Sequence, residues 1–438
     1  MASTGGPAPA PSHPIGRRTL LAGLGAGAAA AVTAGCARGD STAARPGTTS
    51  LANDNATWDA GYIAAGAALK KLTGYSLRPL SNPNPTAYTQ VTQISLQTTK
   101  ATDLVKWASG YKLKQLARSG KLSDLSQIWS AYERKGWVNS SLRDSMSYRG
   151  KVYGVPLYQS YYVLFYNKDL FRRHGLRPAG TWDELLHNAE VLKKAGTTPF
   201  VATQNGNWPA YEWFQELISK VDPDFYSDLI AGKAHYTDPQ AGKAMDIWQD
   251  FMRKGWMTPA DFDQNNGAAA LKAGKVGMFL HGSWQSQGLA AAGLKPGTGF
   301  DAFVMPPVED GTRRSVITES GVLAVPLKAV SHGAAMANAG HWLDPGVQKV
   351  WTDFLQDSSA NPEAGVSNPV VARIKDTVQH DGWAQLPRYG ESGPPNLIQG
   401  NTDDLGAFMT GAMSAQATLR SMAGRATKEW ASWNEDES

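Results

Sequence analysis

Short apolar segments alternate with longer amphipathic segments over most of this chain, and this alternation limits the possible folds more than any other feature. Strands joined in parallel need a crossover connection, which a helix of ten or more residues supplies. The first part of the chain predicts three such pairs, with strands at Thr49 to Ala52, Ser76 to Leu80 and Asp103 to Trp107 and helices at Tyr62 to Thr73, Ala87 to Thr98 and Leu113 to Ser119. The pattern predicts an α/β fold with mostly parallel sheets.

The rest of the chain continues this pattern and adds clear boundaries. Thr181-Trp182-Asp183-Glu184 matches a capping box, in which the threonine hydroxyl and the glutamate satisfy backbone N–H groups at a helix start. Further strands are predicted at Tyr161 to Asn167, Val276 to Leu280 and Gly321 to Pro326, and one long helix at Asp404 to Ala423. Roughly 390 residues follow the N-terminal region, which exceeds the size at which a single core keeps growing, so we expect two lobes.

The N-terminus has the order of a secretory signal. Gly16-Arg17-Arg18 precedes a small, apolar, uncharged stretch that ends at Cys36, and the adjacent arginines suit the twin-arginine type. Cys36 is the only cysteine, so no disulfide forms within one chain. A cysteine directly after Ala34-Gly35 resembles a bacterial lipobox, although Thr33 stands where leucine is usual. We expect lipidation at Cys36; ordinary cleavage nearby is the alternative.

Residues 37–50 are small and polar and include proline and glycine, the composition of a flexible spacer. The signal at 1–36 and this spacer would together hold the folded part on the outer face of a membrane. Net charge is +4, with Lys and Arg scattered, which gives no footprint for nucleic acid. Fifteen Trp and fifteen Tyr are many for a chain of low charge density; some must be core, and a surplus also suits stacking on the flat C–H faces of sugar rings.

One segment, LKAGKVGMFLHGSW (Leu271 to Trp284), runs an apolar strand directly into glycine, serine and tryptophan. The positions after a strand in an α/β sheet face the edge where ligands bind. Gly282 and Ser283 would let the backbone approach a ligand closely, and Trp284 would present a stacking face. The alternative is that Trp284 fills the core of its own lobe.

Four blocks resemble the extracellular solute-binding proteins of bacterial ATP-driven importers, the group that includes maltose-binding protein. They are GKVYGVPLYQSYYVLFYNKDLFRRHGLRPAGTWDELLHNAEVLKKAG, the LKAGKVGMFLHGSW segment, ESGVLAVPLKAVSHGAAMANAGHWL with VWTDFL, and MTGAMSAQATLRSMAGRATKEW. The resemblance spans about Leu69 to Trp433. It implies the two-lobe periplasmic-binding-protein fold, type II and maltose-binding-like, with three hinge crossings and the ligand in a cleft between the lobes.

Carried onto this chain, the resemblance assigns residues 51–155 and 319–362 to one lobe and residues 156–318 and 363–438 to the other. The crossings are expected near Gly154 to Pro156, within Pro306 to Ser320 and near Asn361 to Pro369. Hinges are a few positions that absorb large backbone rotations, which suits these Gly- and Pro-bearing segments.

The expected ligand-binding residues are mostly aromatic and lie at strand ends, hinges or loops. Trp284 and Trp107 follow strands, and either could instead be core. At least one of three tyrosines after the first crossing is expected to face the cleft, and Trp208 lies in a Gly/Asn loop. Glu319 could bind hydroxyls or only pair with Arg313 or Arg314. The full set is Trp107, Tyr158, Tyr161, Tyr162, Trp208, Trp284 and Glu319.

An enzyme is the main alternative to a binding protein. The chain has no Gly-x-Ser-x-Gly elbow and no His-Glu-x-x-His helix, and its eight histidines lack metal-ligand spacing. A glycosidase pair of carboxylates is not excluded by sequence. We therefore expect no catalytic residue, metal or cofactor. A peptide, amino-acid or polyamine ligand would need a countercharge, so we expect a monomer that binds a sugar or oligosaccharide and delivers it to permease subunits in the membrane.

Overall fold

The computed structural model describes residues 45–437. The predicted signal, Cys36 and residues 37–44 of the predicted spacer lie outside this part of the chain. The first strand, β1, begins at Thr48, so three residues that the sequence assigned to the spacer belong to the folded structure. Within the described residues, no helix combines the length and the apolar character needed to cross a membrane.

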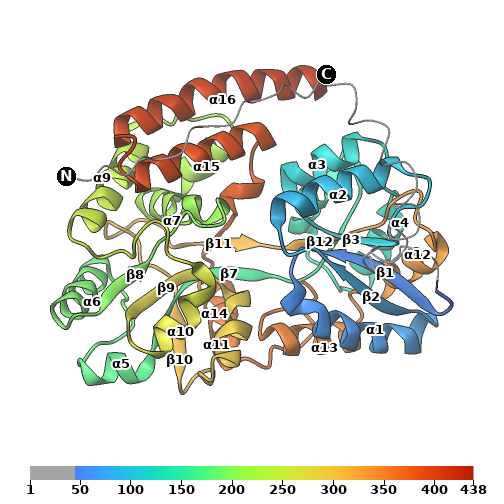
Figure 1. The fold of residues 1–438 in the computed structure, drawn as a ribbon, viewed down its shortest axis with the longest axis horizontal. Coiled ribbons are helices and arrows are strands. Elements are labelled where there is room, and N and C mark those ends of the chain that lie inside the picture. Colours follow the sequence, from blue (N-terminus) through green and yellow to red (C-terminus); the bar gives the residue numbers. More distant parts are fainter. Residues whose placement is uncertain (1–44, 438) are drawn as a thin grey trace, which may run out of the picture. The chain divides into compact units, whose positions relative to one another are not determined.

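Lobe 1 is built on a five-stranded sheet in the order β2-β1-β3-β12-β6 (Figure 1). Its strands are β1 (Thr48–Asn53), β2 (Ser76–Ser81), β3 (Leu104–Ala108), β6 (Val155–Pro156) and β12 (Gly321–Ala324), with the small hairpin β4 (Ser147–Tyr148) and β5 (Lys151–Val152) beside it. Its helices are α1 (Asp59–Thr73), α2 (Pro85–Gln97), α3 (Gly110–Arg118), α4 (Ser126–Arg134), α12 (His332–His341) and α13 (Pro345–Leu355).

Lobe 2 is built on a second sheet in the order β13-β11-β7-β9-β8, with β10 also paired to β7. Its strands are β7 (Ser160–Asn167), β8 (Thr198–Val201), β9 (Val276–Gly282), β10 (Phe300–Phe303), β11 (Ser315–Glu319) and β13 (Ala384–Pro387). Its helices are α5 (Lys168–Arg173), α6 (Trp182–Lys194), α7 (Glu212–Val221), α8 (Pro223–Ile230), α9 (Pro239–Arg253), α10 (Gly267–Lys272), α11 (Ser286–Ala291), α14 (Pro369–His380), α15 (Pro395–Met409) and α16 (Ala415–Glu437).

The chain passes between the two sheets three times, which confirms the predicted two-lobe fold. The first passage joins β6 of lobe 1 to β7 of lobe 2, and the second joins β11 to β12 through Ser320 alone. The third runs from the end of α13 at Leu355 to the start of α14 at Pro369.

The prediction of mostly parallel sheets was wrong, because both sheets are mixed. β1 is parallel to β2 and β3, but β12 is antiparallel to both of its neighbours. In lobe 2, β7 is antiparallel to β9, β10 and β11. The antiparallel strands β7, β11 and β12 adjoin the crossings: β7 and β12 each enter their sheet from the other lobe rather than through a helical crossover, and β11 leaves lobe 2 at the second crossing.

The predicted capping box is present at the start of α6, where Thr181 accepts from the Glu184 N–H and Glu184 accepts from the Thr181 N–H. The prediction of a single long helix at Asp404 to Ala423 was wrong. This segment belongs to two helices, α15 and α16, which are separated at Gly411, whose φ of +76° lies in the left-handed region that favours glycine. This break lets α16 pack back along α15.

Each lobe has its own hydrophobic core. Five tryptophans are less than 2% exposed and account for much of the aromatic surplus: Trp129, Trp342 and Trp351 in lobe 1, and Trp213 and Trp248 in lobe 2. Burying residues of this size makes a large contribution to stability in each lobe. The tryptophans that remain partly exposed are therefore the ones to consider for a binding role.

Candidate functional site

Charged and aromatic side chains gather where the two lobes meet, and we call this group the junction cluster. Lobe 1 and the first crossing contribute Asp54, Trp58, Lys106, Ser109 and Tyr158, and lobe 2 contributes Tyr162, Trp208, Tyr211, Glu212, His281, Trp284, Glu319, Arg388 and Glu391.

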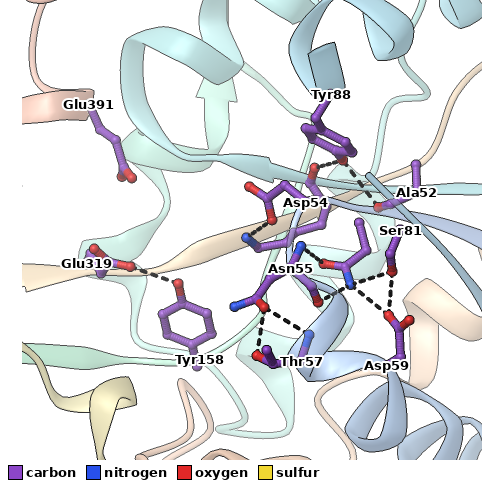
Figure 2. Close-up of polar contacts among 12 residues, drawn as sticks. Ala52, Asp54, Asn55, Thr57, Asp59, Ser81, Tyr88, Tyr158, Glu319 and Glu391 are labelled. Carbon is purple, nitrogen blue, oxygen red and sulfur yellow. Dashed lines mark hydrogen bonds and ion pairs between the residues drawn. The ribbon is translucent and has the colours of Figure 1, made fainter. Parts of the chain in front are cut away.

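The lobe 1 side lies at the carboxyl ends of parallel strands. Asp54 directly follows β1, and Lys106 lies near the end of the neighbouring strand β3. Their side chains form an ion pair, which is drawn from Asp54 in Figure 2. The Lys106 ammonium is 4.7 Å from the centre of the Trp58 ring. Since parallel strands end at one edge of their sheet, the sequence places these groups together by topology.

The hinge contributes a buried carboxylate that contacts three polar side chains. Glu319 is 7% exposed, and it accepts a hydrogen bond from the Tyr158 hydroxyl at 2.8 Å (Figure 2). It also accepts from the Tyr162 hydroxyl at 3.0 Å. Its Oε2 atom also lies 2.9 Å from Nη1 of Arg388. Tyr158 in turn packs edge-on against Trp58 at 5.7 Å between ring centres, so the hinge residues adjoin the lobe 1 side.

Neither arginine proposed as a partner for Glu319 takes that role. Arg313 pairs with Asp224, and Arg314 donates to the Gly180 carbonyl. Arg388, which follows β13, is the partner instead.

Arg388 and Glu391 connect the polar contacts of Glu319 to lobe 1. Nη1 of Arg388 lies 3.5 Å from Oε1 of Glu391, and Oε2 of Glu391 accepts from the Ser109 hydroxyl of lobe 1. Burial is the largest single influence on Arg388 and lowers its pKa, but Glu319, Tyr162, Tyr211 and Glu391 together outweigh burial and raise the pKa of the guanidinium. Burial also raises the pKa of Glu391, although Arg388 acts in the opposite direction. The lobes are therefore joined here by a charge-assisted contact that does not belong to the hinge strands.

Trp208 is held in the junction cluster by an unusual turn. Asn207 has φ +68° and ψ −64°, a conformation that non-glycine residues rarely adopt. Its side chain donates to Asp403 at 2.7 Å and accepts from Gln399 at 3.1 Å, which holds the turn against α15. The Trp208 ring has the Arg388 guanidinium 4.7 Å from its centre.

Trp284 occupies the end of β9, as the sequence indicated, but Gly282 has a different role from the one expected. A Cβ atom at Gly282 would lie 2.3 Å from Nε1 of Trp284, so the glycine makes room for the indole itself. Trp284 is partly buried and packs against the hydrophobic cluster of lobe 1, not against the core of its own lobe. Among the described residues it has edge-on or tilted aromatic neighbours, His281 and Trp208, and no stacked one.

Two of the predicted site residues lie apart from the junction cluster. Trp107 is partly buried, donates from Nε1 to the Lys112 carbonyl at 3.1 Å, and its ring lies 6.0 Å from that of Tyr88. Tyr161 is 1% exposed and packs in a lobe 2 cluster with Val163 and Phe165. The structure brings together the other five: Tyr158, Tyr162, Trp208, Trp284 and Glu319.

Sequence reasoning missed several members of the cluster, for two reasons. Arg388 and Glu391 follow β13, a four-residue strand that ends in proline and is not among the strands predicted from the sequence. Asp54 follows a strand that the sequence predicts, but the ligand-binding residues expected at strand ends were aromatic. Within residues 45–437, no group of three or more His, Cys, Asp or Glu side chains is placed to hold a metal ion.

The family model for bacterial extracellular solute-binding proteins matches residues 48–349, which is more than half of the chain. The chain belongs to this family. A curated relative of this solute-binding protein is an uncharacterised ABC transporter extracellular-binding protein of Pyrococcus horikoshii, 25% identical over 300 residues. That match covers 68% of the present chain and 63% of the Pyrococcus protein.

Solved structures show the same fold as this solute-binding protein. One is a bacterial solute receptor described as having an exclusive preference for β-D-galactopyranose, with a TM-score of 0.76, 19% identity, and coverage of 90% of this chain and 100% of that one. Another is the maltose-maltodextrin binding protein of Alicyclobacillus acidocaldarius, with a TM-score of 0.67, 17% identity, and coverage of 87% and 100%. The α/β architecture with two lobes is therefore the maltose-binding-like, type II fold.

Proposed function

We propose that this solute-binding protein captures a neutral sugar or oligosaccharide between its lobes and delivers it to the permease of an ABC importer. The observation that carries the proposal is the state of Trp284: partly exposed at a strand end, beside the other lobe, with no ring stacked on it among the described residues. An unoccupied indole face suits the C–H face of a sugar ring.

Two ion pairs of the junction cluster support a neutral ligand. Asp54 pairs with Lys106, and Glu319 pairs with Arg388, so these side chains neutralise one another without a ligand. Carboxylates and guanidinium groups held in this way offer acceptors and donors to hydroxyl groups. The preference for galactopyranose named for one protein of the same fold, and the maltose-maltodextrin binding named for another, agree with this class of ligand.

A ligand that contacts both lobes binds the closed arrangement better, and this difference in affinity shifts the population toward closure. The three crossings let the lobes rotate while each core stays intact. We propose that the protein acts as a monomer without a cofactor and that it leaves the sugar chemically unchanged.

A panel of carbohydrates tests the proposal. Galactose, maltose, maltotriose, raffinose and chitin oligosaccharides are added to the purified protein, with an amino-acid mixture, a tripeptide and spermidine as the other arms. We expect at least one carbohydrate to raise the melting temperature and to be recovered intact by chromatography. A shift only with the peptide, amino-acid or polyamine arms contradicts the sugar proposal, and conversion to shorter products contradicts the binding role.

Trp284→Ala is expected to weaken binding of the carbohydrate found in that panel by about 1–3 kcal/mol, the scale of a lost aromatic contact in a desolvated site. The melting temperature of the empty protein should fall by less than for a fully buried core tryptophan, because Trp284 is only partly buried and packs against the cluster of the other lobe. Calorimetric titration and thermal melting measure both quantities.

Trp182 provides a matched control in the same lobe. It is partly buried and stacks on Phe251, away from the junction cluster. Trp182→Ala should lower the melting temperature and leave the affinity unchanged. If Trp284→Ala keeps full affinity and instead loses the roughly 3–5 kcal/mol of stability expected for a truncated core tryptophan, the role proposed for Trp284 is wrong.

We also propose that the protein is anchored through a lipid on Cys36, which supports an extracellular position at the cell membrane. The proposal rests on the adjacent arginines, the apolar stretch and the cysteine that follows Ala34-Gly35. Residues 37–47 would then connect the anchor to β1 at Thr48. A diacylglycerol on this cysteine carries two acyl chains. Insertion of both chains into the bilayer gives the two-chain anchoring that stable membrane attachment requires.

Cys36→Ala is expected to move the protein from the membrane fraction to the medium, because the anchor depends on that sulfur. Detergent phase partitioning of cells that express each form measures the change. Mass spectrometry of the wild-type N-terminus provides the independent check. A wild-type protein that is fully aqueous and begins at another residue contradicts the anchor.

A further inference from the structure

His281 lies at the centre of the aromatic part of the junction cluster. It is 2% exposed and stacks on Phe279 at 4.9 Å with 13° between the rings. Trp208 lies parallel to it at 5.6 Å and 16°, and Trp284 meets it edge-on at 4.3 Å and 63°. Trp208 and Trp284 come from separate 3-10 helices, and within residues 45–437 the His281 imidazole is the ring that contacts both of them.

A carboxylate fixes the orientation of the imidazole. Nδ1 of His281 lies 2.7 Å from Oε1 of Glu212, which is 5% exposed and belongs to the first turn of α7. Because a carboxylate oxygen only accepts, Nδ1 carries the hydrogen in this contact. Gln264 donates to the other oxygen of Glu212 at 3.3 Å, which limits rotation of the carboxylate. The ring of His281 therefore has both its plane and its tautomer set from α7.

We propose that His281, held by Glu212, is a positioning residue that sets the angle between Trp208 and Trp284 and thereby the shape of the surface on which the sugar stacks. The two indoles lie 6.4 Å apart at 52°, and this angle decides which ring geometry of a saccharide can contact both. This inference rests on the proposed sugar-binding function. The arrangement of the two indoles can nevertheless be measured without any ligand.

Two indoles at this distance and inclination couple their electronic transitions, which gives a couplet in the circular dichroism spectrum. Subtracting the spectrum of Trp208→Phe from that of the wild type isolates the signal of this pair from the other tryptophans. His281→Ala and Glu212→Leu are expected to lose most of the couplet. Glu212→Gln keeps an acceptor for Nδ1 and is expected to retain it.

Two further variants keep the result interpretable. His281→Phe retains a stacking ring without the bond to Glu212, so it should fold and give a couplet of altered shape. In the Trp208→Phe background, the His281 changes should have no further effect on this signal. A full-size couplet of unchanged shape in folded His281→Phe and Glu212→Leu overturns the positioning role.

The carbohydrate found by the panel then tests the consequence for binding. His281→Phe and Glu212→Leu should weaken its affinity by a smaller factor than Trp284→Ala, and Glu212→Gln should restore it. If a variant loses the couplet but keeps its affinity, the angle between the two indoles does not control sugar binding. The proposal that the protein binds a sugar would be unaffected by that result. If no carbohydrate in the panel binds, the proposed function fails while the couplet still decides the positioning role.

Discussion

Lys220→Met is expected to lower the free energy of unfolding by about 3–5 kcal/mol, the scale for removing one partner of a buried ion pair. Lys220 and Glu216 lie one turn apart on α7, 1% and 0% exposed, with 3.1 Å between Nζ and Oε1. The Lys220 ammonium also donates to the Ser315 carbonyl of β11 at 2.7 Å. Methionine fills similar space but leaves the glutamate buried without its cation.

Burial dominates both members of this pair. It raises the pKa of Glu216 and lowers the pKa of Lys220, and each partner opposes the shift of the other. Lys220→Met with Glu216→Leu removes both charged groups, so the double variant should recover most of the lost stability. Equilibrium urea unfolding measures the series.

The exposed pair Lys349 and Asp353 on α13, at 2.8 Å, is the matched control. Lys349→Met should cost about 0–1 kcal/mol, because solvent screens a surface pair. A Lys220→Met variant as stable as this control would mean that Glu216 is accommodated without its partner.

Asp357→Asn is expected to remove a component of stability that declines as the pH rises toward neutrality. Asp357 is 1% exposed in the third crossing, where it accepts from the hydroxyls of Ser160 and Ser283 and from the Ser358 N–H. Burial is the largest influence and raises the pKa of its carboxyl from 3.8 to about 7, against the three hydrogen bonds.

The sign of the effect follows from proton binding. Between the unfolded value of 3.8 and the folded value of about 7, the folded protein holds a proton that the unfolded chain has released. Stability from this group is therefore complete below 3.8 and is lost as the pH rises through that interval. Asparagine does not titrate, so the stability of the variant relative to the wild type should rise by about 1.4 kcal/mol per pH unit across the interval.

Unfolding of both proteins at a series of pH values measures this difference, and subtraction cancels the other titrating groups. A difference that stays constant from acid to neutral pH contradicts the raised pKa of Asp357. The result bears on the site as well, because Ser283 directly precedes Trp284 and Ser160 begins β7.

The local pattern of the sequence was enough to predict much of the architecture. The strands β1, β2, β3, β7, β9 and β12 and the capping box of α6 follow from apolar runs and helix-start chemistry, which depend on neighbouring residues only. The strand end at Gly282-Ser283-Trp284 could be found in the same way, as could the aromatic excess. The resemblance of four blocks supplied the two-lobe arrangement, and the matching family model confirms the family.

Tertiary structure alone decided the rest, because partners in a folded protein are distant in sequence. Glu319 meets Arg388 and not the nearby Arg313 or Arg314, and Ser109 meets Glu391 across 282 positions. Tyr161 and Tyr162 are adjacent, yet alternation along β7 sends them into different core clusters, and only from that of Tyr162 does the hydroxyl reach Glu319 in the junction cluster. Local sequence identifies which side chains can act, and the three crossings of the chain determine which of them meet.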